Sequence, residues 1–158
     1  MFREIKRVKQ VLETKECQRI LEESKRGVLA INSEDGYPYA LPLNHIYAKE
    51  ENRLYFHSGK TGYKIECMEK DDKCSYCVIM EAGKNEDGWS LVYKSVIVFG
   101  RVGFVKDEAT IEAIARRLSY KFTLDESYID EEIRKSLRGT AMFYVEIEHM
   151  TGKRVNEK

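Results

Sequence analysis

The chain has 158 residues, and its 27 Lys and Arg residues balance its 27 Asp and Glu residues, so that the formal net charge is zero. A chain of this length corresponds to about one domain and buries enough surface to form a core without disulfides or a structural metal. A zero net charge argues against binding of nucleic acid or an anionic membrane by bulk charge, so an anion would need a local site. We expect one folded domain over residues 1–158.

The sequence favours a cytoplasmic protein. No apolar run approaches the ~18 residues of a membrane-spanning helix, and charged residues follow Met1 where a signal peptide would have an apolar core. The cysteines at positions 17, 67, 74 and 77 are too few and too scattered for the disulfide framework of a small secreted domain.

Cys74 and Cys77 form a Cys-x-x-Cys pair that suggests, as one alternative, a zinc site or dithiol redox chemistry. The pair lies in residues 74–80, which have the composition of a strand, and residues three apart on a strand point to opposite faces. We therefore expect buried cysteines that act as small hydrophobic residues, and no metal site.

The first predicted elements are a short helix and a hairpin. Thr14 is a candidate N-cap of the helix, and Gly27 stands where a C-terminal stop would be. Residues 28–31 and 37–47 are predicted to form strands joined by a turn at 33–36. The second strand contains two prolines, which cannot donate to a ladder. It should therefore lie at an edge, contain a bulge, or face something other than a strand, such as a ligand.

The remaining elements follow in chain order. We expect a strand at 53–57, a glycine-bearing loop and helix at 63–68, strands at 74–80 and 89–105, a helix after Asp107, a short helix at 129–137 and a strand at 141–149. About six strands, mostly joined by short turns, indicate a mainly β protein whose antiparallel sheet closes into a barrel with peripheral helices. No Gly-x-Gly-x-x-Gly joins a strand to a helix, so a Rossmann nucleotide site is not expected.

Residues 57–64, His-Ser-Gly-Lys-Thr-Gly-Tyr-Lys, form a polar loop between a strand and a helix start. Free N–H groups and the dipole at a helix N-terminus attract an anion, and the loop adds hydroxyl groups and the charges of Lys60 and Lys64. A Walker A loop would need glycine where the chain has Leu54. The loop is therefore a candidate phosphate site, and the alternative is a solvated turn with two surface lysines.

The segment 37–45, Tyr-Pro-Tyr-Ala-Leu-Pro-Leu-Asn-His, is predicted to lie beside this loop. Unpaired backbone groups near Pro42 could contact the edge of a heteroaromatic ring, while Leu43 and Val96 provide apolar contact. The two segments together predict a site for a planar ring that carries a phosphate.

Several motifs occur in an order that resembles the pyridoxamine-phosphate-oxidase-like FMN-binding split barrels, and within them the sequence is most similar to the nitroimidazole-resistance flavoproteins. The motifs are Gly36-Tyr37-Pro38-Tyr39, Pro42-Leu43-Asn44, Leu54-Tyr55-Phe56-His57-Ser58 with Gly62 and Lys64, Tyr93-Lys94-Ser95-Val96 with Gly100, and residues 147–153. The similarity runs from about residue 3 to residue 153.

The resemblance implies a six-stranded antiparallel split β-barrel and a homodimer with one FMN at each end of the subunit interface. Its flavin-ring contacts map onto Leu43, Asn44 and His45. Its pyrimidine-side and phosphate contacts map onto His57, Ser58, Gly62 and Lys64, and a further flavin-contacting segment maps onto Ser95 and Val96. His57 is the candidate catalytic residue, either as a proton donor to substrate or as a hydrogen-bonding wall of the FMN site.

The chain departs from the family pattern at two places. His45 stands where many relatives have a smaller or aromatic residue, and Lys60-Thr61 makes the phosphate loop more basic than usual. The C-terminal residues 151–158 lack the arginine-rich end of relatives that oxidise pyridoxamine phosphate, so oxidation of vitamin B6 is not expected.

The leading hypothesis is an FMN-dependent oxidoreductase that reduces a small planar acceptor, such as a nitroaromatic compound, with electrons from NAD(P)H or another donor. One alternative is a flavin-binding module without turnover, which acts as a sensor, carrier or interaction protein. Another is a small barrel that stacks single-stranded nucleic acid on its tyrosines, which the zero net charge makes the weaker choice.

Overall fold

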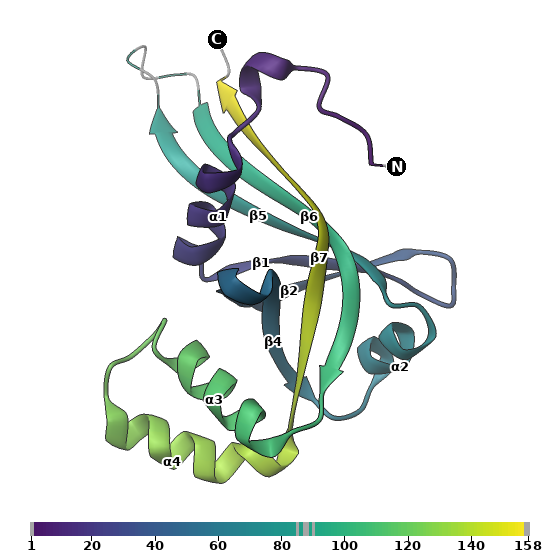
Figure 1. Cartoon of the computed structure of the whole chain (residues 1–158), viewed down its shortest axis with the longest axis vertical. Coiled ribbons are helices and arrows are strands. Elements are labelled where there is room, and N and C mark those ends of the chain that lie inside the picture. The colour runs from purple at the N-terminus through teal and green to yellow at the C-terminus, as the bar shows by residue number, and fades with distance from the viewer. Residues whose placement is uncertain (1, 85, 87–88, 90, 157–158) are drawn as a thin grey trace.

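The computed structural model describes residues 2–84, 86, 89 and 91–156, which form a strongly curved antiparallel sheet with helices around it (Figure 1). The strands are β1 (Arg26–Asn32), β2 (Pro38–Asn44), β3 (Ile46–Ala48), β4 (Arg53–Gly59), β5 (Lys73–Lys84), β6 (Leu91–Val105) and β7 (Thr140–Asn156). The helices are α1 (Thr14–Glu23), α2 (Tyr63–Lys70), α3 (Glu108–Ser119) and α4 (Glu126–Ser136), with 3-10 turns η1 (Val8–Gln10), η2 (Lys49–Glu51) and η3 (Leu137–Gly139).

The order of the strands explains how the sheet closes. In the described part of the chain the order is β2-β1-β5-β6-β7-β4-β3, so β2 and β3 are the two edges. These edges are consecutive in sequence and are joined through His45 alone. The predicted strand 37–47 is therefore two strands that pair at opposite ends of the sheet, which makes seven strands where six were expected. Of the three alternatives left open for the proline-bearing strand, the structure shows an edge position.

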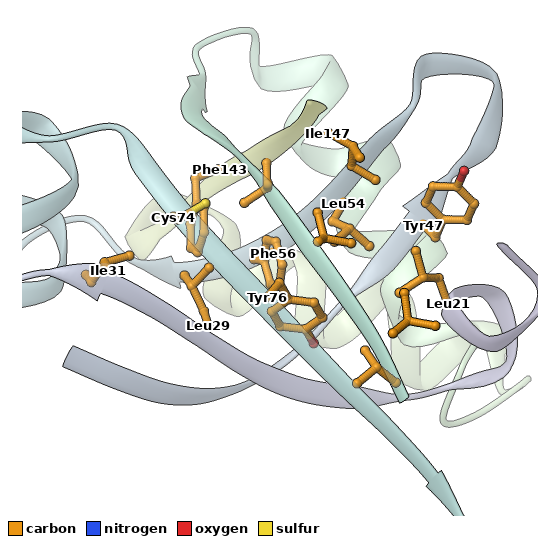
Figure 2. Packing of buried hydrophobic residues seen from close by; sticks show 14 of the residues in the cluster. Leu21, Leu29, Ile31, Tyr47, Leu54, Phe56, Cys74, Tyr76, Phe143 and Ile147 are labelled. Carbon is orange, nitrogen blue, oxygen red and sulfur yellow. The ribbon is translucent and has the colours of Figure 1, made fainter. Parts of the chain in front are cut away.

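The inner face of the sheet carries the main hydrophobic core. Phe56, Tyr76 and Phe143 come from three different strands and gather in its middle (Figure 2). The rings of Phe56 and Phe143 are stacked, with centroids 5.0 Å apart, and the Tyr76 ring meets Phe56 edge-on at 5.1 Å. Such contacts add to the large apolar area that each aromatic side chain buries.

A second, smaller core lies on the outer face of the sheet beneath α3. Ile114 and Leu118 of α3 pack there with residues of β3, β4 and β7, among them Tyr55 and Met142. The predicted start of α3 is confirmed, because the Asp107 carboxylate accepts a hydrogen bond of 2.8 Å from the Thr110 amide. In the same way, Asp125 caps α4.

Two predictions about α1 are wrong. Glu13, not Thr14, is the N-cap, and the helix ends before Ser24, so Gly27 is not its stop. Gly27 lies inside β1, where a Cβ atom would come within 2.5 Å of the Cys77 carbonyl oxygen and 2.6 Å of the Tyr76 ring. The glycine is required by this close approach of β5 rather than by a helix end.

The cysteines of the Cys-x-x-Cys pair lie on opposite faces, as the strand period predicts, but only Cys74 is buried as expected. Cys74 is buried on the inner face of β5, while Cys77 on the other face is partly exposed. Within residues 2–84, 86, 89 and 91–156, no group of three or more histidine, cysteine or acidic residues is arranged to hold a metal ion. The helices in these same ranges do not include one that is long and apolar enough to cross a membrane.

Candidate functional site

The candidate site lies where β2 and β4 face each other without pairing. Residues from both strands, together with Arg26 of β1, line a cavity of about 300 Å³. The lining residues are Arg26, Pro42, Leu43, Asn44 and His57. Among the described strands β2 pairs only with β1, so its other edge is free along this cavity. The structure thus brings together Leu43, Asn44 and His57, which were predicted to share a site.

The wall formed by β2 is held from behind by one hydrogen bond and one close polar contact. Arg26 Nε donates to Asn44 Oδ1 at 2.8 Å, and the Tyr76 hydroxyl lies 3.0 Å from the Leu43 carbonyl oxygen. Leu43 and Asn44 are both half-buried. Backbone and amide groups at such an edge are suited to read the polar rim of a planar ring.

The His45 side chain does not enter the cavity. It is fully buried in the interior, with Nε2 2.8 Å from the Leu21 carbonyl oxygen and Nδ1 2.8 Å from the Tyr76 hydroxyl. A carbonyl oxygen can only accept, so Nε2 carries the proton and Nδ1 accepts from Tyr76. Burial, together with the positive charge of Lys121, lowers the pKa of His45 to about 4. A ligand in the cavity could meet only the main chain of this residue.

The predicted phosphate loop has the features of an anion site. Gly62 adopts φ +116°, a backbone conformation that favours glycine, and it leads directly into α2, whose first turn has no side-chain cap. Lys64 is half-buried, and burial lowers its pKa. Within the described ranges, no carboxylate forms an ion pair with Lys64. A half-buried cation without a counter-ion favours the binding of an anion here.

His57 lies on β4 close to this loop. Its side chain is exposed on the outer face of the strand, while that of Phe56 points into the core. Partial loss of solvent and the ammonium group of Lys64 lower the pKa of His57, so its ring is neutral at pH 7. A neutral imidazole can donate one hydrogen bond and accept another.

Both ends of α2 are anchored to the hairpin of β1 and β2. The Tyr63 hydroxyl donates to Asp35 at 3.1 Å, and Lys70 forms an ion pair with Glu34. In Figure 1 the tip of this hairpin lies above α2. The phosphate loop therefore has a defined position relative to β2.

Within a single chain, Ser95 and Val96 do not lie at the candidate site. Ser95 pairs with Lys153 on β7, whereas Ser58 pairs with Ala141, about 12 residues and about 40 Å away along that strand. The Val96 side chain is fully buried in the core. Ser95 lies on the opposite, outer face of the sheet, so it could contact a ligand at this site only from a second copy of the chain.

Two features near the site had no signal in the sequence. Tyr76 was predicted only as part of a strand, yet its hydroxyl contacts both Leu43 and His45. A second cavity, of about 270 Å³, lies on the other side of His57, against α3 and α4. The Tyr76 contacts and the second cavity both bring together segments that are far apart in the sequence, so local sequence patterns could not reveal them.

A larger cavity, of about 800 Å³, lies next to the phosphate loop. Lys60 lines it together with Lys106, Arg134 and Arg138, and these four side chains form no ion pair within the described part of the chain. Glu108, Glu112 and Asp130 line the same cavity, so its walls carry charges of both signs and the basic character expected of the loop does not continue along α3 and α4.

Curled antiparallel strands with a cavity at an unpaired seam define a split barrel built around a ligand site. A family model described as pyridoxamine 5'-phosphate oxidase matches residues 13–154, and the chain belongs to this family. This confirms the resemblance indicated by the motifs. A search among curated proteins found no match.

Solved structures show the same fold. A proposed 5-nitroimidazole antibiotic resistance protein of Bacteroides thetaiotaomicron has a TM-score of 0.78 and 23% identity, with 92% of this chain and 87% of that chain covered. An FAD-binding protein of Mesorhizobium loti has a TM-score of 0.65 and 24% identity, with 92% and 97% covered. An FAD and haem binding protein of Mycobacterium smegmatis has a TM-score of 0.72 and 17% identity, with 95% and 74% covered. The expected fold class is confirmed.

Proposed function

We propose that the protein is a cytoplasmic FMN-dependent oxidoreductase that transfers electrons from NAD(P)H or another donor to a small planar acceptor such as a nitroaromatic compound. The observation that carries this proposal is Lys64, a half-buried cation without a counter-ion at the uncapped start of α2. A short loop separates it from His57 of β4, which lines the cavity along the free edge of β2. The arrangement fits a phosphate at one end and a flat ring at the other.

The residues have distinct tasks in this proposal. Lys64, the Ser58 hydroxyl and the N–H groups that follow Gly62 would hold the phosphate. Leu43 and Asn44 would contact the ring along β2. Flavin supplies the redox chemistry when bound, because it accepts a hydride from a donor and passes electrons on.

The substrate side of the reaction needs protons as well as electrons. Reduction of a nitro group to a nitroso group takes up two electrons and two protons and releases water. A hydride from NAD(P)H accounts for both electrons and one proton, and the second proton comes from solvent or from His57. His57 would also hold the acceptor by donating a hydrogen bond from its neutral ring.

Support for a homodimer comes from the outer face of β1, β5 and β6. Val28, Ile79, Ile97 and Phe99 share this face, and they are 43%, 65%, 39% and 39% exposed. Ser95 lies among them, opposite Ile79 in the ladder. A second copy that covered this face would bury the apolar side chains and carry its own Ser95 toward a neighbouring site.

The comparisons give the proposal a broader basis. The description of the family names a pyridoxamine 5'-phosphate oxidase, and two of the structural relatives are described as FAD-binding. The relative from Bacteroides thetaiotaomicron supports a nitroaromatic acceptor. We favour FMN because the chain presents one half-buried lysine at its phosphate loop.

The test begins with the absorption spectrum of the purified protein and chromatography of the released cofactor. We expect a yellow protein that releases FMN, sediments as a dimer, and is bleached by NAD(P)H and re-oxidised by a nitroimidazole. A flavin that no donor reduces would instead indicate a binding module without turnover. A colourless monomer that fails to take up FMN or FAD would overturn the proposal.

A further inference from the structure

The 300 Å³ cavity along β2 contains one charged group that has no task in the proposed function. Arg26, the first residue of β1, lines the cavity together with Pro42, Leu43, Asn44 and His57. Arginine keeps its proton in proteins, and the ring of His57 is neutral at pH 7. The described residues that line the cavity therefore give it one positive charge and no carboxylate.

The side chain of Arg26 is held beside β2 by Asn44. The two residues are directly opposite each other in the ladder of β1 and β2, and Arg26 Nε donates to Asn44 Oδ1 at 2.8 Å. An arginine side chain can only donate, so the amide oxygen of Asn44 faces Arg26 and the amide NH₂ group is left to donate elsewhere. The contact therefore orients both side chains at the cavity.

The charge of Arg26 is not neutralised by a carboxylate. Within residues 2–84, 86, 89 and 91–156, Arg26 takes part in no ion pair, and Asn44 is the one partner of its side chain. Arg26 is exposed, so water weakens its field in the empty cavity. A ring that covered the cavity would exclude this water and strengthen the interaction.

The polar hydrogen atoms at this end of the cavity determine which edge of a ring fits. Arg26 offers its terminal NH₂ groups and Asn44 offers its amide NH₂ group, so both side chains present donors. The pyrimidine edge of a flavin carries two carbonyl oxygens and an acceptor nitrogen, whereas its dimethylbenzene edge has no hydrogen-bonding atom. The two side chains therefore favour the pyrimidine edge. This step rests on the proposed function, because it takes the ring to be a flavin.

We propose that Arg26 binds the pyrimidine edge of the flavin and raises its reduction potential. A hydride adds two electrons and one proton to the oxidised ring, so the reduced ring carries one negative charge unless it takes a second proton from solvent. The positive charge of Arg26 attracts this anion more strongly than it attracts the neutral oxidised ring. Arg26 thus holds the reduced cofactor more tightly and favours electron transfer from the donor.

The test measures the reduction potential of the bound flavin, which depends on no physiological donor or acceptor. The purified flavin-loaded protein is reduced stepwise with dithionite at pH 8 beside a reference dye of known potential. Arg26→Gln removes the charge from the cavity, and Arg26→Lys keeps it. Lys25→Gln is the matched control, since it removes one positive charge from the preceding residue, which does not line the cavity. Both positions are exposed, so no substitution disturbs the core.

We expect the equilibrium constant for flavin reduction to fall about tenfold or more in Arg26→Gln, which corresponds to a potential lower by about 30 mV or more. In Lys25→Gln and Arg26→Lys this constant should stay within about threefold of the wild-type value. The proton affinity of the reduced flavin should also rise about tenfold in Arg26→Gln, because the anion loses a stabilising charge. The pH at which the spectrum of the reduced flavin changes measures this affinity, which a merely structural role of Arg26 would not alter.

The dissociation constants of oxidised and reduced FMN provide a second measurement if Arg26→Gln retains too little flavin for the dye method. Arg26→Gln should weaken the binding of reduced FMN at least tenfold more than the binding of oxidised FMN. Equal weakening of both forms, or a potential that is unchanged in this variant, would overturn the role of Arg26 and leave the proposed function intact.

The outcomes separate the two proposals. A flavin that dithionite reduces but no donor reduces would contradict the proposed function, while the potentials would still report the effect of Arg26. A protein that binds no flavin would overturn both.

Discussion

The hydroxyl group of Tyr76 lies 2.8 Å from Nδ1 of His45, at the point where the chain passes from β2 to β3. His45 in turn donates from Nε2 to the Leu21 carbonyl oxygen. With Nε2 donating to Leu21 and Nδ1 accepting from Tyr76, the neutral imidazole has a partner for both ring nitrogens. The contact links the interior of the barrel to the strand end that forms the candidate ring site.

The buried His45 makes stability depend on pH. Its pKa is about 4 in the folded protein and 6.5 when exposed, so the unfolded state binds the proton first as the pH falls. The free energy of unfolding should therefore decrease by about 3 kcal/mol between pH 6.5 and pH 4. Urea denaturation at several pH values measures this change. In His45→Gln the decrease over the same interval should be smaller, and an equal decrease would contradict the assignment.

Removing the Tyr76 hydroxyl tests the same contact from the other side. Tyr76→Phe keeps the ring packed against Phe56 but leaves Nδ1 of His45 buried without a partner. We expect a loss of about 1–3 kcal/mol in the free energy of unfolding. Tyr144→Phe is a control, since no hydrogen bond of its hydroxyl is found in the described residues. Equal losses in both variants would argue against the role of the His45 contact.

Lys64 and Lys60 provide a matched pair on one loop. Lys64→Ala removes the half-buried cation and should weaken FMN retention by about 1.5–3 kcal/mol, the contribution of a charge-assisted hydrogen bond. Lys60 is exposed, so the effect of Lys60→Ala should be smaller and should fade with added salt. Fluorescence titration of FMN measures both affinities. Unchanged retention in Lys64→Ala would place the phosphate elsewhere.

Gly100 has a purely steric requirement. A Cβ atom at this position would overlap the Glu146 carbonyl oxygen, at the irregularity where β6 changes register against β7. Gly100→Ala should destabilise the fold by about 4 kcal/mol or more, because backbone atoms must move. At Gly139 an added Cβ meets nothing within 4 Å, so Gly139→Ala should be tolerated. Thermal denaturation of the two variants provides the comparison, and similar midpoints would refute it.

The pH profile of turnover distinguishes the two roles considered for His57. Burial and Lys64 lower its pKa, so the ring is largely neutral above pH 6.5. We expect a hydrogen-bonding role, with kcat nearly constant from pH 6.5 to 8 and partial activity in His57→Gln. If His57 donates the proton, kcat should rise toward acidic pH in the wild-type protein, and this rise should be absent from the variant.

Local patterns were sufficient for most of the elements. The Asp107 cap, the proline-bearing edge strand and the helix that starts at Tyr63 all depend on neighbouring residues, and all are present in the structure. The division of residues 37–47 could not be predicted in this way. It depends on β3 pairing with β4 while β2 pairs with β1, which is a property of the closed sheet.

The candidate site likewise has some features that depend on neighbouring residues and others that depend on distant contacts. The loop with Gly62 and Lys64 is contiguous, and its chemistry can be inferred from residue types alone. The direction of the His45 side chain is decided by the acceptor at Leu21, 24 residues away, and that of Val96 by the core. Sequence motifs identify the strand that meets a ligand more easily than they identify which of its side chains do so.

The last pair in the ladder of β6 and β7 is Val105 with Met142, so the chain leaves the barrel and returns to it at adjacent positions. The segment between them, which includes α3 and α4, is an insertion whose two ends are held together by the sheet. Evolution could replace such an insertion with one of another length or composition while the strands kept their register. Homologous proteins could in this way acquire new chemical preferences without rebuilding the scaffold beneath.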